Sequence, residues 1–205
     1  MSSFLHRGDQ LKSHALDIQQ LVNPSCHVTV VNQEIWVQVH PQYLCSVLEC
    51  LRSNMLFQYE HLYDILGLDL SRISRFPRGS SSTDINPTDD HLAVVYVIDS
   101  RRLHQRVYVT VALSQESLSL PSVSSIFTGA AWFEREVYDM YGIIFHQHPD
   151  LRRILTDYGF QGHPLRKDFP LSGYYEVRYD ALEKRILSVP TKVESQTVEC
   201  YNSLV

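Results

Sequence analysis

The sequence predicts an α+β fold, in which an N-terminal domain of helix, hairpin, helix and sheet is followed by an extended, mostly irregular C-terminal segment. Three observations predict it. Near the N-terminus, segments whose apolar residues recur at helical spacing stand before and after a segment with the two-residue spacing of strands. Two β-rich segments follow in the middle of the chain. Beyond residue 142, prolines and glycines recur and interrupt regular structure.

The first quarter of the chain predicts two short amphipathic helices around a hairpin. Apolar residues recur at helical spacing over 11–22, and Pro24 ends that helix. Residues 28–39 alternate between apolar and polar on both sides of a polar turn, which is typical of two paired strands. A second helix is expected over 41–54, with its proline in the first turn.

The middle of the chain predicts further strands. Residues 62–68 form a weak strand pattern, and residues 72–90 contain prolines, glycine and serines that indicate a mobile loop. The segments 92–98 and 106–113 are rich in β-branched and aromatic residues, and a polar turn joins them. We therefore expect a second hairpin.

A charged helix is expected over residues 130–141, with Thr128 as its cap and Gly142 at its end. We expect the chain to divide into an α+β domain over 1–127, this helix and its exit over 128–145, and an extended interaction segment over 146–205.

Composition excludes several classes of protein. With 44% hydrophobic and 20% charged residues the chain is typical of neither disordered nor membrane-spanning proteins. A net charge of -5 argues against general binding of nucleic acid. No obvious signal or transit peptide is expected at the N-terminus. The four cysteines lack a C-x-x-C pair, which favours a reducing compartment; they are Cys26, Cys45, Cys50 and Cys200.

Three carboxylates in the charged helix are candidates for general acid–base chemistry, namely Glu134, Glu136 and Asp139. Crowded carboxylates shift one another's pKa values. The alternative is structural: Arg135 stands four residues before Asp139 and could neutralise it, and glutamates early in a helix favour its positive end. We favour the structural interpretation because no nucleophile or metal motif accompanies the carboxylates.

Three histidines are candidates for a zinc site. His146 and His148 would share one side of an extended chain, with His163 as a third ligand. Hydrogen bonding to backbone or carboxylate is the favoured alternative, since no thiolate accompanies them. Phosphate-loop, dinucleotide, hydrolase and iron–sulfur motifs are absent from the sequence. The many tyrosines and arginines favour a large protein interface.

Two segments resemble one family, the 30 kDa subunit of respiratory complex I, NADH:ubiquinone oxidoreductase. The first carries the family's signature spacing: Glu134-Arg135-Glu136, Asp139, Met140-Tyr141, His148, Arg152, Ile154 and Leu155. The second is Gly162-His163-Pro164-Leu165-Arg166-Lys167-Asp168-Phe169-Pro170. Pro121-Ser122-Val123 and residues 175–179 also look like family features. The loop at 72–90 departs from the family in its length.

The resemblance implies a non-redox core subunit of the hydrophilic, peripheral arm of the proton-pumping complex. This subunit would catalyse no reaction by itself. The resemblance also implies that this chain holds no cofactor, and that partner subunits bind NADH, FMN, iron–sulfur clusters and ubiquinone. The chief partner would be the 49 kDa-type quinone-site subunit, which this chain braces. Partner-contact residues would be Glu134, Arg135, Glu136, Asp139, His148, Arg152, Arg153, His163, Arg166, Lys167 and Asp168.

The expected location is the matrix side of the mitochondrial inner membrane, with the cytoplasmic side of a bacterial membrane as the alternative. Two other functions stay open from the sequence. The chain could be the equivalent subunit of a hydrogenase or chloroplast-type complex, or a metal hydrolase that uses the histidines.

Overall fold

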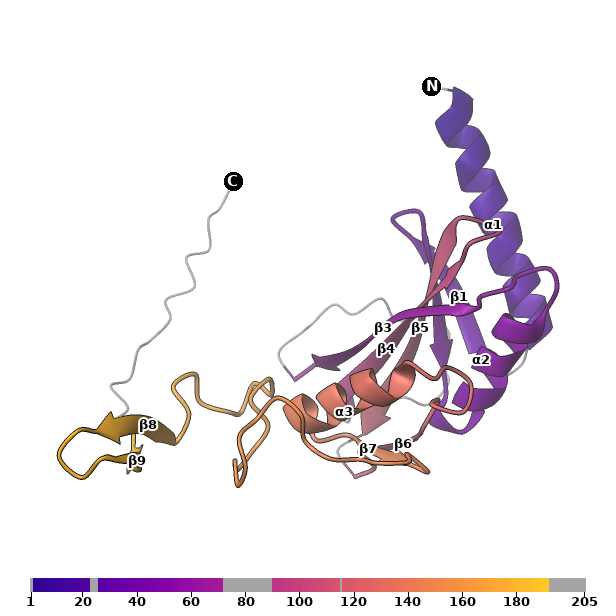
Figure 1. Ribbon diagram of the computed structural model, residues 1–205. Coiled ribbons are helices and arrows are strands. Elements are labelled where there is room, and N and C mark those ends of the chain that lie inside the picture. Colours follow the sequence, from indigo (N-terminus) through magenta and orange to yellow (C-terminus); the bar gives the residue numbers. More distant parts are fainter. Residues whose placement is uncertain (1, 23–25, 72–89, 115, 192–205) are drawn as a thin grey trace. The chain divides into compact units, whose positions relative to one another are not determined.

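The structure, a computed structural model, describes residues 2–22, 26–71, 90–114 and 116–191 (Figure 1). Its centre is a five-stranded sheet of order β1-β2-β5-β4-β3. The strands are β1 (Cys26–Val31), β2 (Glu34–Val39), β3 (His61–Asp69), β4 (Asp90–Ser100) and β5 (Gln105–Ser114). The expected loop at 72–90 lies outside the described residues, except that Asp90 begins β4.

Both N-terminal helices bury an apolar stripe. Helix α1 (Ser2–Val22) places Leu11, Ala15 and Ile18 in the core, and it packs against β1. The 3₁₀ turn η1 (Pro41–Tyr43) leads into α2 (Leu44–Ser53). The three leucines of α2 that face the sheet are fully buried, and each contributes roughly 2 kcal/mol of hydrophobic stabilisation.

The sheet joins two hairpins edge to edge. β1 pairs with β2 and β4 pairs with β5, both antiparallel, as the strand patterns of the sequence predict. β2 and β5 then pair in parallel, with Val37 opposite Val109. Antiparallel β3 completes the sheet beside β4. This arrangement places β5 in the middle, where its odd-numbered residues from Val107 to Leu113 are buried.

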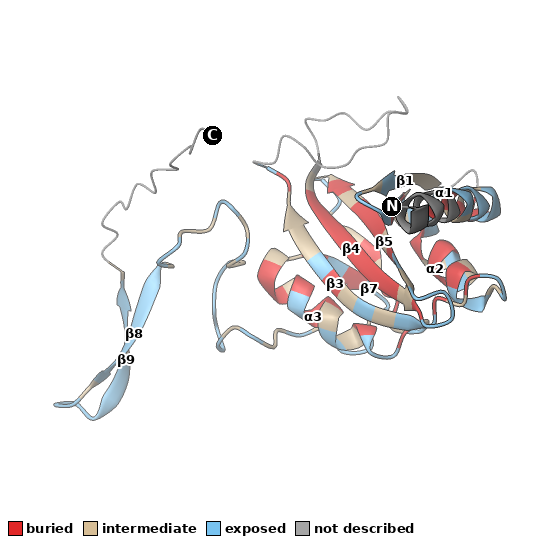
Figure 2. Ribbon diagram, turned by 90° about the horizontal axis from the view of Figure 1, so that it is seen from above, coloured by how far each residue is buried: buried red, intermediate tan, exposed pale blue. Residues whose placement is uncertain are grey.

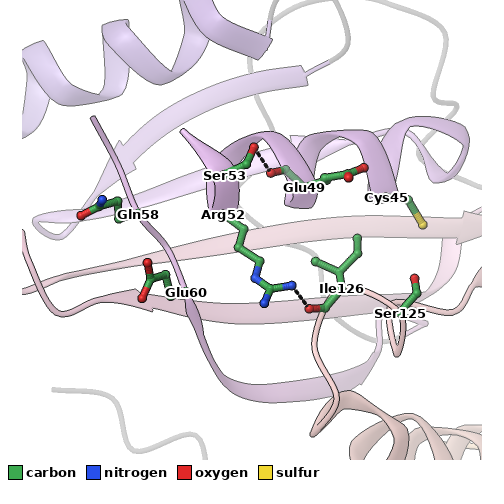
Figure 3. A pocket seen from close by; sticks show the side chains of 8 residues that line it. All are labelled: Cys45, Glu49, Arg52, Ser53, Gln58, Glu60, Ser125 and Ile126. Carbon is green, nitrogen blue, oxygen red and sulfur yellow. Dashed lines mark hydrogen bonds between the residues drawn. The ribbon is translucent and has the colours of Figure 1, made fainter. Parts of the chain in front are cut away.

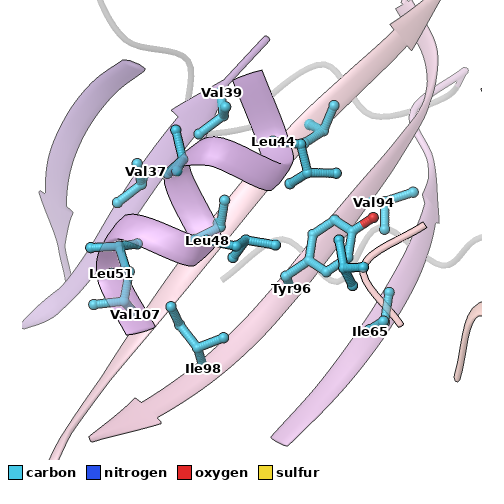
Figure 4. Close-up of a cluster of buried hydrophobic side chains, with 14 of the residues drawn as sticks. Val37, Val39, Leu44, Leu48, Leu51, Ile65, Val94, Tyr96, Ile98 and Val107 are labelled. Carbon is cyan, nitrogen blue, oxygen red and sulfur yellow. The ribbon is translucent and has the colours of Figure 1, made fainter. Parts of the chain in front are cut away.

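One continuous core lies between the sheet and its helices (Figure 4). Leu44, Leu48 and Leu51 of α2 face inward-pointing strand residues such as Val37 and Tyr96 (Figure 4). Figure 2 shows the buried residues concentrated in β4, β5 and the inner sides of α2 and α3. The core therefore holds the sheet as a rigid platform for α3.

Helix α3 (Ala130–Tyr141) coincides with the predicted charged helix and packs against β3. Gly67 in β3 makes this approach possible, because a Cβ there would lie 2.3 Å from the ring of Tyr141. Gly142 ends the helix with a left-handed φ of 74°, as predicted. The N-cap is Gly129 rather than Thr128, and it makes no side-chain cap.

A small parallel sheet ties both ends of the α3 region together. β6 (Ser119–Pro121) precedes the helix and β7 (Ile144–His146) follows it. The two strands pair in parallel, and the N–H of Ser122 donates to the carbonyl of His146 at 2.9 Å. The chain before α3 therefore lies beside the chain after it.

The chain divides into two compact units, Met1–Lys167 and Asp168–Val205. Our expected divisions after residues 127 and 145 do not appear in this grouping, because α3 and residues 146–167 are bonded to the first unit. In the second unit β8 (Tyr175–Asp180) and β9 (Arg185–Pro190) form an antiparallel hairpin, where we had expected mostly irregular chain. Mixed helix and sheet confirm the α+β class. No described helix combines the length and hydropathy that crossing a bilayer requires.

Candidate interaction site

Helix α3 carries four charged side chains, three of which are directed into the protein. Glu134 and Asp139 have no exposed surface, and Arg135 is 8% exposed. Glu136 is exposed. The sequence gives no sign of this burial, because charged residues are rarely buried unless partners elsewhere in the chain satisfy them.

Glu134 is held by the segment that precedes its own helix. One carboxylate oxygen accepts from the hydroxyl of Ser122 at 2.6 Å, and the other accepts from the N–H of Val123 at 2.7 Å. Burial raises the pKa of the Glu134 carboxyl above its usual value, and these bonds and the nearby His148 offset only part of that effect. Glu134 thus joins α3 to the end of β6.

His148 joins the segment after β7 to the same carboxylate. Its Nδ1 accepts from the N–H of Asp150 at 3.0 Å, so a neutral ring carries its proton on Nε2. That nitrogen lies 3.1 Å from the carbonyl oxygen of Ala131 and 3.6 Å from Glu134. His148 therefore fixes the 146–150 segment against the first turn of α3.

Asp139 organises residues 153–156 around a single carboxylate. One oxygen accepts from three consecutive N–H groups, those of Ile154 (3.2 Å), Leu155 (2.9 Å) and Thr156 (2.9 Å). The other accepts from the Thr156 hydroxyl at 2.7 Å and from Arg153 at 3.3 Å. Burial by itself would raise the pKa of the Asp139 carboxyl, but the hydrogen bonds outweigh it and hold the pKa below its usual value.

The arginines of this region connect its segments. Arg153, rather than the expected Arg135, pairs with Asp139, and it also donates to the carbonyl of Gly162 at 3.0 Å. Arg135 donates to the carbonyl of Arg152 at 3.1 Å, and its guanidinium lies 5.0 Å from the centre of the Trp132 ring. Both arginines therefore hold irregular chain onto α3.

The second motif segment caps the C-terminal end of α3. The last carbonyls of a helix lack partners within it. Here His163 Nδ1 donates to the carbonyl of Asp139 at 2.9 Å, the N–H of Leu165 donates to Met140 at 3.2 Å, and Arg166 donates to Tyr141. Burial lowers the pKa of His163, although the Asp139 carbonyl opposes that shift. Residues 163–166 of the second motif are thus bonded to the helix that carries the first motif.

The remaining expected contact residues are on the surface. Glu136, Arg152, Lys167 and Asp168 are all exposed, and Arg152 forms an exposed ion pair with Asp150. Within the same stretch of the first unit, five large apolar side chains are exposed: Trp132 (65%), Ile144 (49%), Leu155 (60%), Tyr158 and Leu165 (49%). We define these five apolar residues as the apolar margin. Exposed apolar side chains in such number are a feature of surfaces that bind other proteins.

Two of the carboxylates proposed for acid–base chemistry and two of the histidines proposed for a zinc site are used in hydrogen bonds within the protein. Both oxygens of Glu134 and of Asp139 accept hydrogen bonds inside the protein, which is a structural use. His148 and His163 bond to carbonyls at opposite ends of α3. Across the described ranges, no three His, Cys, Asp or Glu side chains gather into a group suited to a metal ion.

Several residues of the site were not predicted as site residues. Ser122 and Thr156 each satisfy a buried carboxylate, and Asp69 of β3 accepts from the N–H of Lys167 at 2.7 Å. The only signal for Ser122 was its place in the Pro121-Ser122-Val123 motif. No sequence pattern around Thr156 or Asp69 marks them as site residues, because each acts on a segment that only the fold brings near.

A groove of about 740 Å³ lies between α2, the residues just before β3 and the loop before α3 (Figure 3). Its lining is polar and of mixed charge, including Glu49, Arg52 and Glu60. Arg52 spans it and donates to the carbonyl of Ile126 (Figure 3). The groove therefore has a cross-link between its walls.

Comparisons with known proteins agree with the resemblance. The model of the family described as "Respiratory-chain NADH dehydrogenase, 30 Kd subunit" matches residues 37–175. A protein of Prototheca wickerhamii named NADH-ubiquinone oxidoreductase subunit 9 is 47% identical over 161 residues, which cover 78% of this chain and 74% of that protein. A subunit of the NADH-quinone oxidoreductase of Paramagnetospirillum magneticum is 44% identical over 168 residues, covering 80% and 76%.

The fold is also similar to that of a solved chain. A chain in the structure of the membrane-bound sulfane sulfur reductase, described as an archaeal respiratory membrane complex, aligns with a TM-score of 0.59. The alignment covers 78% of this chain and 85% of that one at 19% identity, so the likeness concerns the fold alone.

Proposed function

This chain belongs to the family of the respiratory-chain NADH dehydrogenase 30 Kd subunit, and from that membership we propose that it braces the quinone-site subunit in the peripheral arm of complex I. The chain is a subunit of NADH–quinone oxidoreductase, and catalysis belongs to the assembled complex. The 49 kDa-type subunit is the proposed partner. NADH, FMN, iron–sulfur clusters and ubiquinone are the proposed cofactors and substrates of partner subunits.

The observation that carries the proposal is the network around Asp139. Its carboxylate fixes residues 153–156, which have no helix or strand of their own, in one conformation. A segment fixed before binding loses little conformational entropy on docking. Leu155, in the middle of this segment, is 60% exposed. The network therefore suits a chain that presents a rigid apolar margin to another protein.

Buried and exposed motif residues have different proposed roles. Glu134, Arg135, Asp139 and His148 are used within the chain, so they position the contact segments rather than touch the partner themselves. Arg153, His163 and Arg166 do the same at the end of α3. Glu136, Arg152 and Lys167 are exposed, and they are the proposed polar rim of the interface. Asp168, which is exposed on the second unit, is a separate proposed contact.

The hairpin of the second unit is a further proposed contact. Tyr175, Val177 and Tyr179 alternate along β8, so they share one face, and they are 62%, 61% and 65% exposed. Ile186, paired with Tyr179, extends this face and is 70% exposed. A two-stranded hairpin is marginally stable in water by itself. A partner surface that covers this face would stabilise it.

Substitutions on the two faces of the hairpin test the proposal. We expect the triple variant Tyr175→Ser, Val177→Ser, Tyr179→Ser to reduce co-purification with the 49 kDa-type subunit at least about tenfold, since each apolar side chain contributes roughly 1.5–3 kcal/mol when buried. NADH-dependent quinone reduction by the membranes should fall in parallel. Quantifying both subunits in detergent-purified complex gives the result.

The matched control changes the opposite face of the same strand. Glu176→Ser with Arg178→Ser alters two exposed residues of β8 without touching the apolar face. This variant should assemble nearly as the unchanged chain does. Equal assembly of the triple variant and the control would refute the hairpin contact. If the unchanged chain were absent from the purified complex, the proposed function itself would be refuted.

The complex to which this family belongs is membrane-associated. The proposed location is peripheral, on the matrix side of the mitochondrial inner membrane or the cytoplasmic side of a bacterial one. Extraction with carbonate after selective opening of each compartment would show the side. The match to NADH dehydrogenase subunits favours this complex over a hydrogenase or chloroplast-type relative.

A further inference from the structure

Two turns far apart in sequence interlock at one end of the sheet. Residues 54–57 form a turn in the connection from α2 to β3, and residues 101–104 join β4 to β5. The Ser100 hydroxyl donates to the carbonyl of Phe57 at 2.7 Å, and Arg102 donates to the carbonyl of Met55. We define the two-turn surface as Met55, Leu56, Arg101, Arg102 and Leu103.

The first turn is held rigidly in place. The N–H of Leu56 donates to the side chain of Asn54 at 2.8 Å, and Phe57 behind it is 2% exposed. The N–H of Tyr59 donates to the carbonyl of Leu51 at 3.2 Å, which ties the exit of the turn to α2. The outward position of Met55 and Leu56 is therefore built into the fold.

The two-turn surface is strongly apolar for a site in contact with solvent. Met55 is 80% exposed, Leu56 is 68% exposed and Leu103 is 36% exposed. Scattered apolar residues are ordinary on a surface, whereas three from two interlocked turns form a patch. Methionine and arginine are both enriched at protein interfaces.

The same surface is basic although the chain is acidic overall. Arg101, Arg102 and Arg106 lie within six residues of a chain whose net charge is -5. Arg106 is used nearby, since it contacts Asp99 at 3.9 Å and lies over the ring of Tyr63 at 4.3 Å. Arg101 and Arg102 are exposed beside Leu103. Charge complementarity therefore calls for an acidic partner.

We propose that the two-turn surface docks an acidic segment of a second protein subunit, with an apolar side chain against Met55 and Leu56 and carboxylates facing Arg101 and Arg102. The inference rests on the proposed function only in that the chain assembles into a complex. The surface is separate in sequence from the apolar margin and from the β8–β9 hairpin, so it provides an additional contact.

An anionic membrane is the weaker candidate for the same surface. A basic side chain at such a membrane strengthens binding by roughly fivefold, so two arginines give only about 25-fold. The net charge of -5 on the chain opposes this attraction. A protein partner can instead place a carboxylate opposite each of the two guanidinium groups.

Methionine oxidation compares the surface in the free chain and in the complex. The sequence has three methionines, of which Met55 is 80% exposed and Met140 is 9% exposed. Under mild peroxide, Met55 should oxidise readily in the purified free chain and at least about tenfold more slowly in the assembled complex. Met140 serves as the internal reference, since its burial in α3 should keep it slow in both. Equal oxidation of Met55 in both states would overturn the proposal.

A charge-preserving substitution identifies the partner carboxylate. Arg101→Lys supplies an amine, so a carbodiimide should couple position 101 to an Asp or Glu of a neighbouring subunit in the assembled complex. The unchanged chain, which lacks that amine, is the control. Coupling only to a second copy of this chain would overturn the proposal. It would also be overturned if the free chain bound vesicles of anionic lipid while position 101 coupled to no subunit of the complex.

Charge reversal measures the contribution of the surface. Arg101→Glu should reduce the fraction of chain recovered in the complex at least about fivefold, and reversal of the coupled carboxylate to lysine should restore it. Lys12→Glu, an exposed change of the same kind on α1, should leave recovery unchanged. If Arg101→Glu and Lys12→Glu assemble equally while the chain still co-purifies, this proposal fails and the proposed function stands.

Discussion

At the scale of single residues, two buried carboxylates on one helix have pKa values shifted in opposite directions. Asp139 receives five donors, whereas Glu134 receives two and lies near a histidine. The pKa of Asp139 is lowered and that of Glu134 is raised. Sequence spacing could place both residues on α3 but could not predict these surroundings, because Ser122 and residues 153–156 reach them only through the fold.

We expect Asp139→Asn to destabilise the protein by about 2–4 kcal/mol. An asparagine keeps one acceptor oxygen and puts an NH₂ group where the other was, so several buried donors lose their acceptor, at roughly 1–3 kcal/mol each. In the unchanged protein the Asp139 contribution is present above the unfolded pKa of about 3.9 and is lost as pH falls through the lower folded pKa. Urea unfolding at a series of pH values between about 7 and 2 measures both effects.

Asp150→Asn is the matched control for this substitution. Asp150 is exposed and pairs with the equally exposed Arg152, and surface ion pairs contribute about 0–1 kcal/mol. Its stability should therefore stay close to that of the unchanged protein at every pH. A gap between Asp139→Asn and the unchanged protein that persists undiminished at the lowest pH would contradict the role assigned to the carboxylate.

At the scale of elements, local patterns predicted α3 and its end far better than they predicted what covers that end. Apolar spacing and Gly142 located the helix over 130–141, and the structure has Ala130–Tyr141. The cap supplied by His163, Leu165 and Arg166 was not predicted, because a sequence of prolines and charges does not show which carbonyls it will reach. The end of α3 and residues 163–166 are therefore one structural element.

Gly142→Ala should therefore disturb the second motif as well as the helix. Its φ of 74° costs a residue with a Cβ roughly 1–2 kcal/mol. The added Cβ would also lie 2.5 Å from His163 Nε2 and 2.7 Å from Arg166 Nη2, so the cap must move. We expect faster hydrogen exchange at the Leu165 amide, whose partner is the Met140 carbonyl.

Gly129→Ala is the control for this glycine. A Cβ at Gly129 meets nothing within 4 Å, and its φ of -69° is ordinary for any residue. Its stability and its exchange at Leu165 should match those of the unchanged chain. Similar exchange in both variants would show that the cap does not depend on the turn at Gly142.

At the scale of the whole molecule, the sequence predicted hairpins but not how they join. The strand patterns that predict β1–β2 and β4–β5 are local, whereas the parallel pairing of Val37 with Val109 brings together residues 72 positions apart in the chain. Long-range contacts also decide where the first unit ends, which is at Lys167 rather than before residue 146. Residues 146–167 looked extended because they lack periodicity, yet side-chain bonds to α3 make them part of Met1–Lys167.

This boundary predicts where trypsin acts on the free chain. Arg178, Lys184 and Arg185 are exposed in the hairpin, whereas Arg153 and Arg166 bond to backbone carbonyls in the first unit. Cleavage after the three hairpin residues should be at least about tenfold faster than after the other two, because a protease needs locally opened chain. In the assembled complex the hairpin sites should become slow as well. Timed digestion with peptide mass analysis compares the sites, and equal rates in the free chain would contradict the division at Lys167.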